Sequence, residues 1–325
     1  MLMIIKQFVI ASKLALPMLL VTLLITAGCA ESQNDLPPYG TPVAASQSTD
    51  LSQGDEQAPL LWRVATSSGH EVYLFGSIHI GSAGWYPLPD FIMDAFYSSG
   101  YLATEVDVDS GRPVSASSPW RFEPGRLLTD YISTELYERA VAFLTEHEPG
   151  FNPLGLTVYK PLYWMSMIAQ VSFDEAGLTG VYGIETVFMQ EAERLGIDIL
   201  SLERSAEQLD IYYGLSIPLQ VAMLEDSLDK DRTLQELFTL SELWLVGDEQ
   251  GLEERQASVF YAEYIEAVLR QRDLGIADTI ERYLAEGMNV FVIAGIDHMI
   301  GEGSIVDILL KRGHAVELVS GSSDR

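Results

Sequence analysis

Apolar and polar positions along the chain change their period several times, and each change predicts an element. After residue 60, two short runs rich in β-branched and aromatic residues flank Ser67-Ser68-Gly69, a combination typical of a β-hairpin. A helical stretch and a third strand follow. These four ranges are Trp62–Thr66, Glu71–Ile80, Phe91–Tyr97 and Tyr101–Val108. Strand, helix and strand in this order predict a βαβ unit whose second and third strands are neighbours in a parallel sheet.

The middle of the chain has mainly the helical period, and the last third returns to alternating strands and helices. Ser205 and Gln208 have capping-box spacing and predict a helix start. Further helices are expected at Thr134–Thr145, Tyr159–Val171, Glu185–Leu195, Ala262–Glu286 and Ile305–Lys311, and strands at Ile197–Leu202, Asn289–Ala294 and Ala315–Val319. The pattern therefore predicts an α/β fold: a central mixed or mainly parallel sheet flanked by helices, with a helical middle segment.

The first residues have the pattern of an export signal. Two lysines precede an apolar run from Leu14 to Thr26, and small residues follow it, so residues 1–28 are expected to be a signal peptide. The run is shorter than the roughly 20 apolar residues of a membrane span. The protein is therefore expected to be exported.

Cys29 is the only cysteine of the chain. Ala27-Gly28-Cys29 resembles the lipobox of bacterial lipoproteins, which implies that Cys29 is lipidated and becomes the mature N-terminus. Ala30 after the cysteine is similar to the sorting signal for the outer membrane, where the protein would face the periplasm. An ordinary signal peptide with an unrelated cysteine is the alternative.

Composition separates the rest of the chain into a tether and a domain. Residues 29–60 are polar and poor in large apolar residues, so they are expected to form a flexible tether. Residues 61–320 are expected to fold as one domain. The net charge is −28, and loss of Lys6 and Lys13 with the leader takes it to about −30. Because nucleic-acid binding depends on clustered basic residues, this charge argues against a nucleic-acid partner.

Two copies of Gly-x-x-His stand out among the candidate motifs. Gly76 to His79 and Gly295 to His298 each follow an apolar β-type run, so each histidine should lie just beyond the carboxyl end of a strand. In open α/β sheets that edge is where ligands bind. Glycine also lets the backbone turn sharply as it leaves the sheet. Since the chain has only five histidines, the recurrence favours one shared site over two unrelated core residues.

Glu105 is the candidate acidic partner of these histidines. Glu105 and Asp107 point to the same side of the third strand, and acids in an apolar strand need a cation or hydrogen-bond donors. His79, His298 and Glu105 would form a two-histidine, one-carboxylate set suited to zinc, iron or manganese. The alternative is that the two acids face solvent at the strand end.

Arg272 falls in the apolar stripe of the predicted helix Ala262–Glu286. A guanidinium there needs a buried carboxylate or an anionic group of a substrate, and a structural salt bridge is the favoured interpretation. Glu185 and Glu203 are further candidates because each follows a turn or a strand end.

Segments that match one family in order and position cover nearly all of the chain from Leu60 to Val319. They are Val72–Gly81, Tyr86–Pro89, Thr104–Asp107, Gly183–Glu185, Leu202–Glu203, Arg272–Asp273 and Ala294–Gly301. As a set they resemble the TraB/PrgY/GumN family, which includes the Tiki metalloproteases. The resemblance implies an erythromycin-esterase-like and ChaN-like architecture, and metal-site roles for His79, His298 and Glu105. Two departures are Asp273, where the family usually has asparagine, and an apparent insertion at Ser110–Gly125.

The leading hypothesis is a metal-dependent hydrolase, and first a peptidase, because Tiki-type relatives cut peptide bonds with a divalent cation. His79, Glu105 and His298 would hold Mn, Co or Zn, and Glu105, Glu185 and Arg272 would take part in catalysis, with a carboxylate such as Glu185 assisting the water. The partner would be a peptide or protein substrate in the cell envelope. Two alternatives are a protein that binds metal, haem or a signalling peptide without turnover, and a scaffold-like protein with a vestigial site.

Overall fold

The computed structural model describes residues 58–67, 69–106, 119–148 and 150–321. The predicted signal peptide, Cys29, most of the tether, Asp107 and the first part of the expected insertion lie outside the described residues.

A six-stranded mixed sheet forms the centre of the fold, in the order β4-β3-β5-β2-β1-β6. The strands are β1 (Leu61–Ala65), β2 (Glu71–Ser77), β3 (Tyr101–Val106), β4 (Asp198–Glu203), β5 (Val290–Gly295) and β6 (Ala315–Leu318). The four strands from β4 to β2 are parallel, and β1 pairs antiparallel with both β2 and β6. The prediction of an α/β fold with a mixed, mainly parallel sheet is confirmed.

The strand β5 lies between β2 and β3, so the predicted pairing of the second and third strands is wrong. Every residue of β5 is buried, as expected for a parallel strand with neighbours on both edges and helices on both faces. Such a strand gains most by lying in the middle of the sheet, whatever its place in the sequence. As a result, the two strands that end in Gly-x-x-His are direct neighbours.

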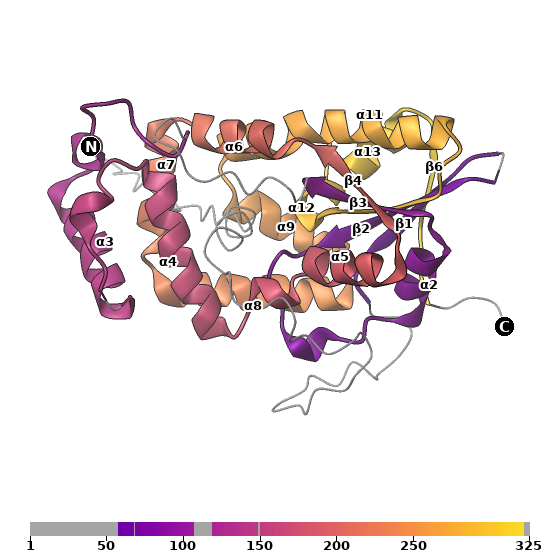
Figure 1. Ribbon diagram of the computed structural model, residues 1–325, viewed down its shortest axis with the longest axis horizontal. Helices are drawn as coiled ribbons and strands as arrows, with labels where there is room; N and C mark the ends of the chain where they lie inside the picture. Colours follow the sequence, from indigo (N-terminus) through magenta and orange to yellow (C-terminus); the bar gives the residue numbers. More distant parts are fainter. Residues whose placement is uncertain (1–57, 68, 107–118, 149, 322–325) are drawn as a thin grey trace, which may run out of the picture.

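Helices cover both faces of the sheet. On one side lie α11 (Gln271–Ala285) and α13 (Ile305–Lys311), and on the other lie α2 (Asp90–Ser98) and α5 (Ile184–Leu195) (Figure 1). Between the sheet and the helices α2 and α5, four aromatic rings pack with centroids 5.0–5.8 Å apart: Phe75, Phe96, Phe188 and Phe291. This aromatic cluster fixes α5 against β2 and β5, and so fixes the start of α5 near the ends of these strands.

The middle of the chain forms a helical part beyond the carboxyl ends of β2 and β3, whose arrowheads point toward it in Figure 1. Its helices are α3 (Thr134–His147), α4 (Pro161–Ala176), α6 (Ser205–Gly214), α7 (Ile217–Ser227), α8 (Lys230–Val246) and α9 (Glu249–Val259). The short 3-10 turns are η1 (Ala83–Trp85), η2 (Leu128–Asp130), η3 (Pro153–Gly155) and η4 (Gly180–Tyr182). The helical part therefore covers the carboxyl edge of the sheet.

The predicted helix Ala262–Glu286 is a continuous helical run with an irregular first half. It consists of α10 (Ala262–Tyr264), a π-helical segment η5 (Ile265–Arg270) and α11. Wide π turns often occur at functional sites because they change which side chains face a site. Here the π turn lies next to Arg272.

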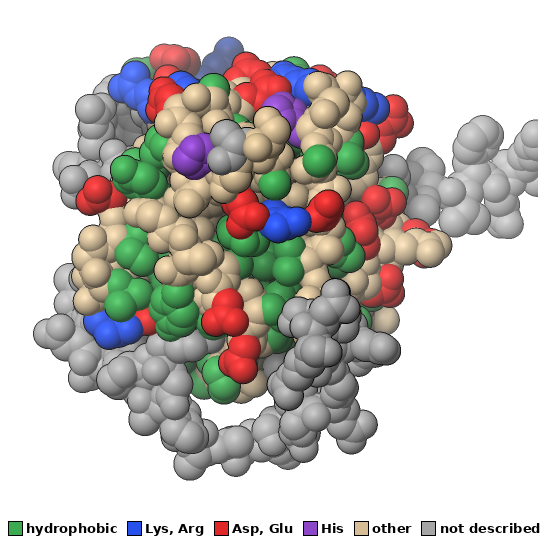
Figure 2. All heavy atoms as spheres, turned by 90° about the vertical axis from the view of Figure 1, so that its right-hand side faces the viewer, with side chains coloured by type: hydrophobic (Ala, Val, Ile, Leu, Met, Phe, Trp, Pro, Cys, Tyr) green, Lys and Arg blue, Asp and Glu red, His purple; other side chains and the backbone are tan. Residues whose placement is uncertain are grey.

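The end of the sheet away from the helical part has a surface of mixed character. Figure 2 shows that acidic, basic and apolar side chains are interspersed on that face. Among the residues that the structure describes, no helix is long and apolar enough to cross a bilayer.

Candidate metal centre

The first Gly-x-x-His segment is joined to the start of α5. Ile184 N–H donates to the carbonyl of Ile78 at 3.1 Å. A Cβ on Gly183 would lie 2.1 Å from the carbonyl oxygen of His79, so only glycine permits this approach. Glu185, in the first turn of α5, is thereby placed next to His79.

His79, Glu105 and Glu185 form a buried cluster whose ligand atoms lie within 4.8 Å of one another. His79 Nδ1 is 2.8 Å from Glu185 Oε1, and His79 Nε2 is 3.8 Å from Glu105 Oε1. Neither imidazole nitrogen makes an aligned hydrogen bond, and Glu185 Oε2 has no hydrogen-bond partner. Ser77 Oγ donates to Glu185 Oε1. The cluster thus has buried polar atoms without an aligned hydrogen-bond partner, which is costly unless a proton or a ligand compensates for them.

Both carboxylate oxygens of Glu105 are held by donors. Gly295 N–H donates to Oε1 at 2.6 Å, Arg272 Nη2 donates to Oε2 at 2.5 Å, and Gln208 Nε2 donates to Oε2 at 3.2 Å. Burial alone would raise the pKa of Glu105, but the positive charge of Arg272, together with the donated N–H of Gly295, lowers it to about 2. Glu105 is therefore a carboxylate at neutral pH.

All five N–H groups of Arg272 have acceptors. Nε and Nη2 donate to Glu203, Nη2 also donates to Glu105, and Nη1 donates to the carbonyl of Val268 and to His298 Nε2. A guanidinium has five donors, so no donor is left for a substrate in this arrangement. The buried carboxylate of Glu105 and the partly buried carboxylate of Glu203 are the acids that a cation in the apolar stripe requires.

His298 is fully buried beside this arginine, with both ring nitrogens occupied. Nδ1 is 2.5 Å from Asp273 Oδ1, and Nε2 is 3.0 Å from Arg272 Nη1. Since the carboxylate can only accept and the guanidinium can only donate, Nδ1 carries the proton and Nε2 is the acceptor. His298 Nε2 also lies 3.9 Å from Glu105 Oε2.

Negative charge is in excess around the cluster. Four carboxylates, those of Glu105, Glu185, Glu203 and Asp273, face two guanidinium groups, Arg270 and Arg272, which leaves two negative charges uncompensated. Burial opposes a charge on His79, but the carboxylates of Glu185 and Glu105 outweigh it and raise the pKa of His79 to about 9. The site therefore favours a positive charge, either a proton or a metal ion.

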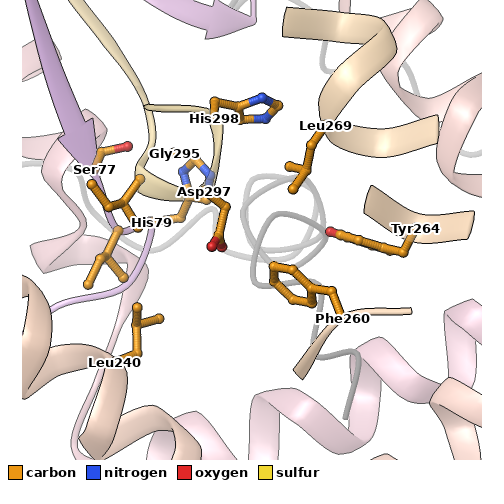
Figure 3. A pocket seen from close by; sticks show the side chains of 11 residues that line it. Ser77, His79, Leu240, Phe260, Tyr264, Leu269, Gly295, Asp297 and His298 are labelled. Carbon is orange, nitrogen blue, oxygen red and sulfur yellow. The ribbon is translucent and has the colours of Figure 1, made fainter. Parts of the chain in front are cut away.

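A small cavity lies in front of the two histidines. Its volume is about 20 Å³, enough for a water molecule or an ion. His79, the carboxylate of Asp297 and the hydroxyl of Tyr264 point into it in Figure 3, and the apolar side chains of Leu240, Phe260 and Leu269 complete the wall. The cavity thus connects the first Gly-x-x-His segment with the end of the second.

The predicted site residues lie together, but in two groups. His79, Glu105 and Glu185 form the cluster. Arg272 donates to Glu105 from outside the cluster, and His298 is hydrogen-bonded to Arg272. Glu185 stands in the cluster where His298 was expected, and the predicted ligand set His79, Glu105 and His298 stays a prediction.

Sequence reasoning missed contributions from three residues. Ser77 and Asp273 were not proposed as site residues, and Gln208 was expected to cap a helix. Gln208 instead donates to Glu105, and α6 starts without a side-chain cap. The proximity of Asp273 to Arg272 and of Ser77 to His79 was the available signal.

Comparisons with known proteins identify the family of the chain. The TraB/PrgY/gumN family model matches residues 60–318, which confirms the resemblance drawn from the motifs. The chain is 26% identical over 243 residues to the uncharacterized protein YbaP of Escherichia coli, covering 73% of this chain and 87% of YbaP. It is 23% identical to human metalloprotease TIKI1 over 319 residues, covering 82% of this chain and 63% of TIKI1. Zebrafish metalloprotease TIKI2 is also 23% identical, covering 75% of this chain and 58% of TIKI2. No solved structure matches the chain.

Proposed function

The chain belongs to the TraB/PrgY/gumN family, and from its buried cluster we propose that it is a metal-dependent hydrolase, a peptidase of the cell envelope. The observation that carries the proposal is the set of buried polar atoms without a hydrogen-bond partner on His79 and Glu185, next to the carboxylate of Glu105. The similarity to proteins named metalloproteases supports the same chemistry.

The cluster fits a divalent cation by donor type and by charge. One imidazole and two carboxylates are ligands that Mn, Co and Zn accept. A divalent ion would neutralise the two excess negative charges of the surroundings. When bound, such an ion activates water and polarises a carbonyl group.

The residues of the chain have separate tasks in this proposal. His79, Glu105 and Glu185 hold the ion, and the free Oε2 of Glu185 is placed to accept a proton from water. Arg272 and the N–H of Gly295 keep Glu105 ionised and fixed in orientation. The apolar wall of Leu240, Phe260 and Leu269 limits the access of bulk water.

We also propose that the protein is exported and anchored by a lipid on Cys29 at the outer membrane, facing the periplasm. The support is the apolar run before Ala27-Gly28-Cys29. Intact-mass measurement of the mature protein, with and without Cys29→Ser, tests it. A diacylated or triacylated N-terminal cysteine is expected, and an unmodified mature N-terminus at another residue contradicts it.

Elemental analysis and peptide cleavage test the enzymatic proposal. Purified wild-type protein should contain or take up one divalent ion per chain, cleave members of a peptide library, and lose cleavage in chelator. His79→Ala should lose both properties, whereas the matched control His147→Ala, on α3, should keep both. Absence of bound metal in the wild type, or cleavage that survives His79→Ala, contradicts the proposal.

Ion binding without turnover is the second candidate function. The cavity of about 20 Å³ favours it, because a peptide side chain needs more room than one water or ion. A tightly bound ion at His79 without cleavage of any peptide or ester would support this candidate over the hydrolase.

A further inference from the structure

The two Gly-x-x-His segments approach Glu105 from different directions. His79 of the first segment faces Glu105 Oε1 with an unsatisfied Nε2. The second segment contributes a backbone donor, Gly295 N–H, to the same oxygen. Its histidine lies 3.9 Å from the other oxygen and is linked to it by hydrogen bonds through Arg272, which donates from Nη2 to Glu105 and from Nη1 to His298.

The tautomer of His298 is set from the side away from Glu105. Asp273 is fully buried and accepts from His298 Nδ1, and its other oxygen accepts from Arg270 Nη1 at 2.9 Å. With the proton on Nδ1, the lone pair of Nε2 points at Arg272. That lone pair is the one a metal ion would need, and the guanidinium already holds it.

We propose that His298 is a positioning residue, which orients Arg272 against Glu105 while His79 binds the metal ion. The second Gly-x-x-His segment then shapes the acidic ligand from both sides, through the backbone at Gly295 and through the side chain at His298. This inference rests on the proposed function for its metal ion, and on hydrogen-bond geometry for the role of His298. It also gives Asp273 a task, because a carboxylate at that position forces one tautomer on His298.

Metal titration of matched histidine variants tests the assignment. His298→Gln keeps an acceptor for Arg272 but removes the imidazole, so it should still bind one Mn²⁺ per chain, with affinity reduced about 10–100-fold as for other residues that orient metal ligands. His298→Ala removes the acceptor and should bind more weakly than His298→Gln. His79→Gln should show no saturable binding, and His147→Gln should match the wild type. Equal loss in His298→Gln and His79→Gln, with both proteins folded by circular dichroism, overturns the inference.

Imidazole nitrogen NMR gives a readout independent of activity and of folding differences between variants. In wild-type protein with Cd²⁺, nitrogen–cadmium coupling is expected at His79 and not at His298. In metal-free protein, His298 should have a protonated Nδ1 and an unprotonated Nε2, and Asp273→Asn should weaken this preference. Coupling at His298, or a protonated Nε2 in the metal-free protein, overturns the inference. A wild type that binds no divalent ion defeats the proposed function instead, and the metal-free spectrum still decides the role of His298.

Discussion

The two Gly-x-x-His segments have the same sequence spacing and end neighbouring parallel strands, yet their histidines have different surroundings. After β2 the chain continues without regular structure, and His79 reaches the cavity beside Glu185. After β5 the chain enters the short helix α12 (Ile296–Met299) at once, and His298 turns toward Asp273 and Arg272 on α11. The register also differs by one residue, since Gly76 pairs with Ala294 and Ser77 with Gly295.

A repeated motif therefore need not give its two histidines the same partners. Gly76 lets the two segments pack closely, because a Cβ there would lie 2.4 Å from Cδ1 of Ile296. The N–H of Gly295 donates a hydrogen bond to Glu105. The backbone path after each glycine decides where its histidine points, and the local spacing of four residues does not contain that path.

Arg272→Leu should have the largest effect on the second segment. It removes the partner of the buried carboxylate of Glu105 and of the partly buried carboxylate of Glu203, and breaking a buried ion pair costs about 3–5 kcal/mol of unfolding free energy. Urea unfolding in chelator measures this loss, and Mn²⁺ should recover part of it, because the ion restores positive charge beside Glu105. The exposed Arg204→Leu should change stability by about 0.5 kcal/mol or less. A loss as small as that in Arg272→Leu would contradict the network.

The pH dependence of metal binding should follow the protonation of His79. Because a metal ligand must be deprotonated and the pKa of His79 is raised to about 9, the proton and the ion compete below that pH. Apparent Mn²⁺ affinity should fall about tenfold per pH unit, so about 100-fold from pH 8 to pH 6. Folding stability of the metal-free protein should change in the opposite direction. The stabilisation by protonated His79 is fully present below its ordinary pKa of 6.5 and is lost as pH rises through about 9. Isothermal titration at several pH values checks the first slope, and a flat profile would contradict it.

Gly183→Ala should damage the first segment and leave the second intact. The new Cβ meets the carbonyl oxygen of His79, and overpacking against backbone costs about 1–3 kcal/mol. Metal binding should weaken with it, because Glu185 moves away from His79. The control Gly275→Ala lies within α11 with open space around its Cβ, and it should stabilise the protein by about 0.4–1 kcal/mol. Thermal unfolding with and without Mn²⁺ compares the two.

Gly76→Ala should have the smallest effect, because its clash is with the end of a flexible side chain. We expect a loss of about 1 kcal/mol, which Ile296→Ala in the same chain should partly remove. A double-mutant cycle measured by urea unfolding should give a coupling energy of about 0.5 kcal/mol or more. Additive effects would mean that the two segments are not packed on each other as described.

Much of the fold follows from patterns that are local in the chain. The period of apolar residues located every strand of the sheet, and the runs ending in Gly76 and Gly295 indicated the edge at which the candidate site lies. The place of β5 between β2 and β3 could not be inferred, since it depends on pairing between segments about 190 to 220 residues apart, as in Tyr101 with Val290 and Val72 with Val290. For the same reason Glu185 was only a weak candidate: its position next to His79 requires the contact between Gly183 and the backbone of His79.

The sequence alone indicated the family, the α/β class and five of the residues that lie together at the sheet edge: His79, Glu105, Glu185, Arg272 and His298. Side-chain type and spacing carry that information, because they fix period, turns and the chemistry that each residue offers. Which donors and acceptors pair at the site depends on the tertiary structure. Asp273 and Arg272 occupy both nitrogens of His298, while those of His79 lack an aligned hydrogen-bond partner. Hydrogen bonds between distant elements depend on distances of a few tenths of an ångström, which packing sets and a linear pattern does not encode.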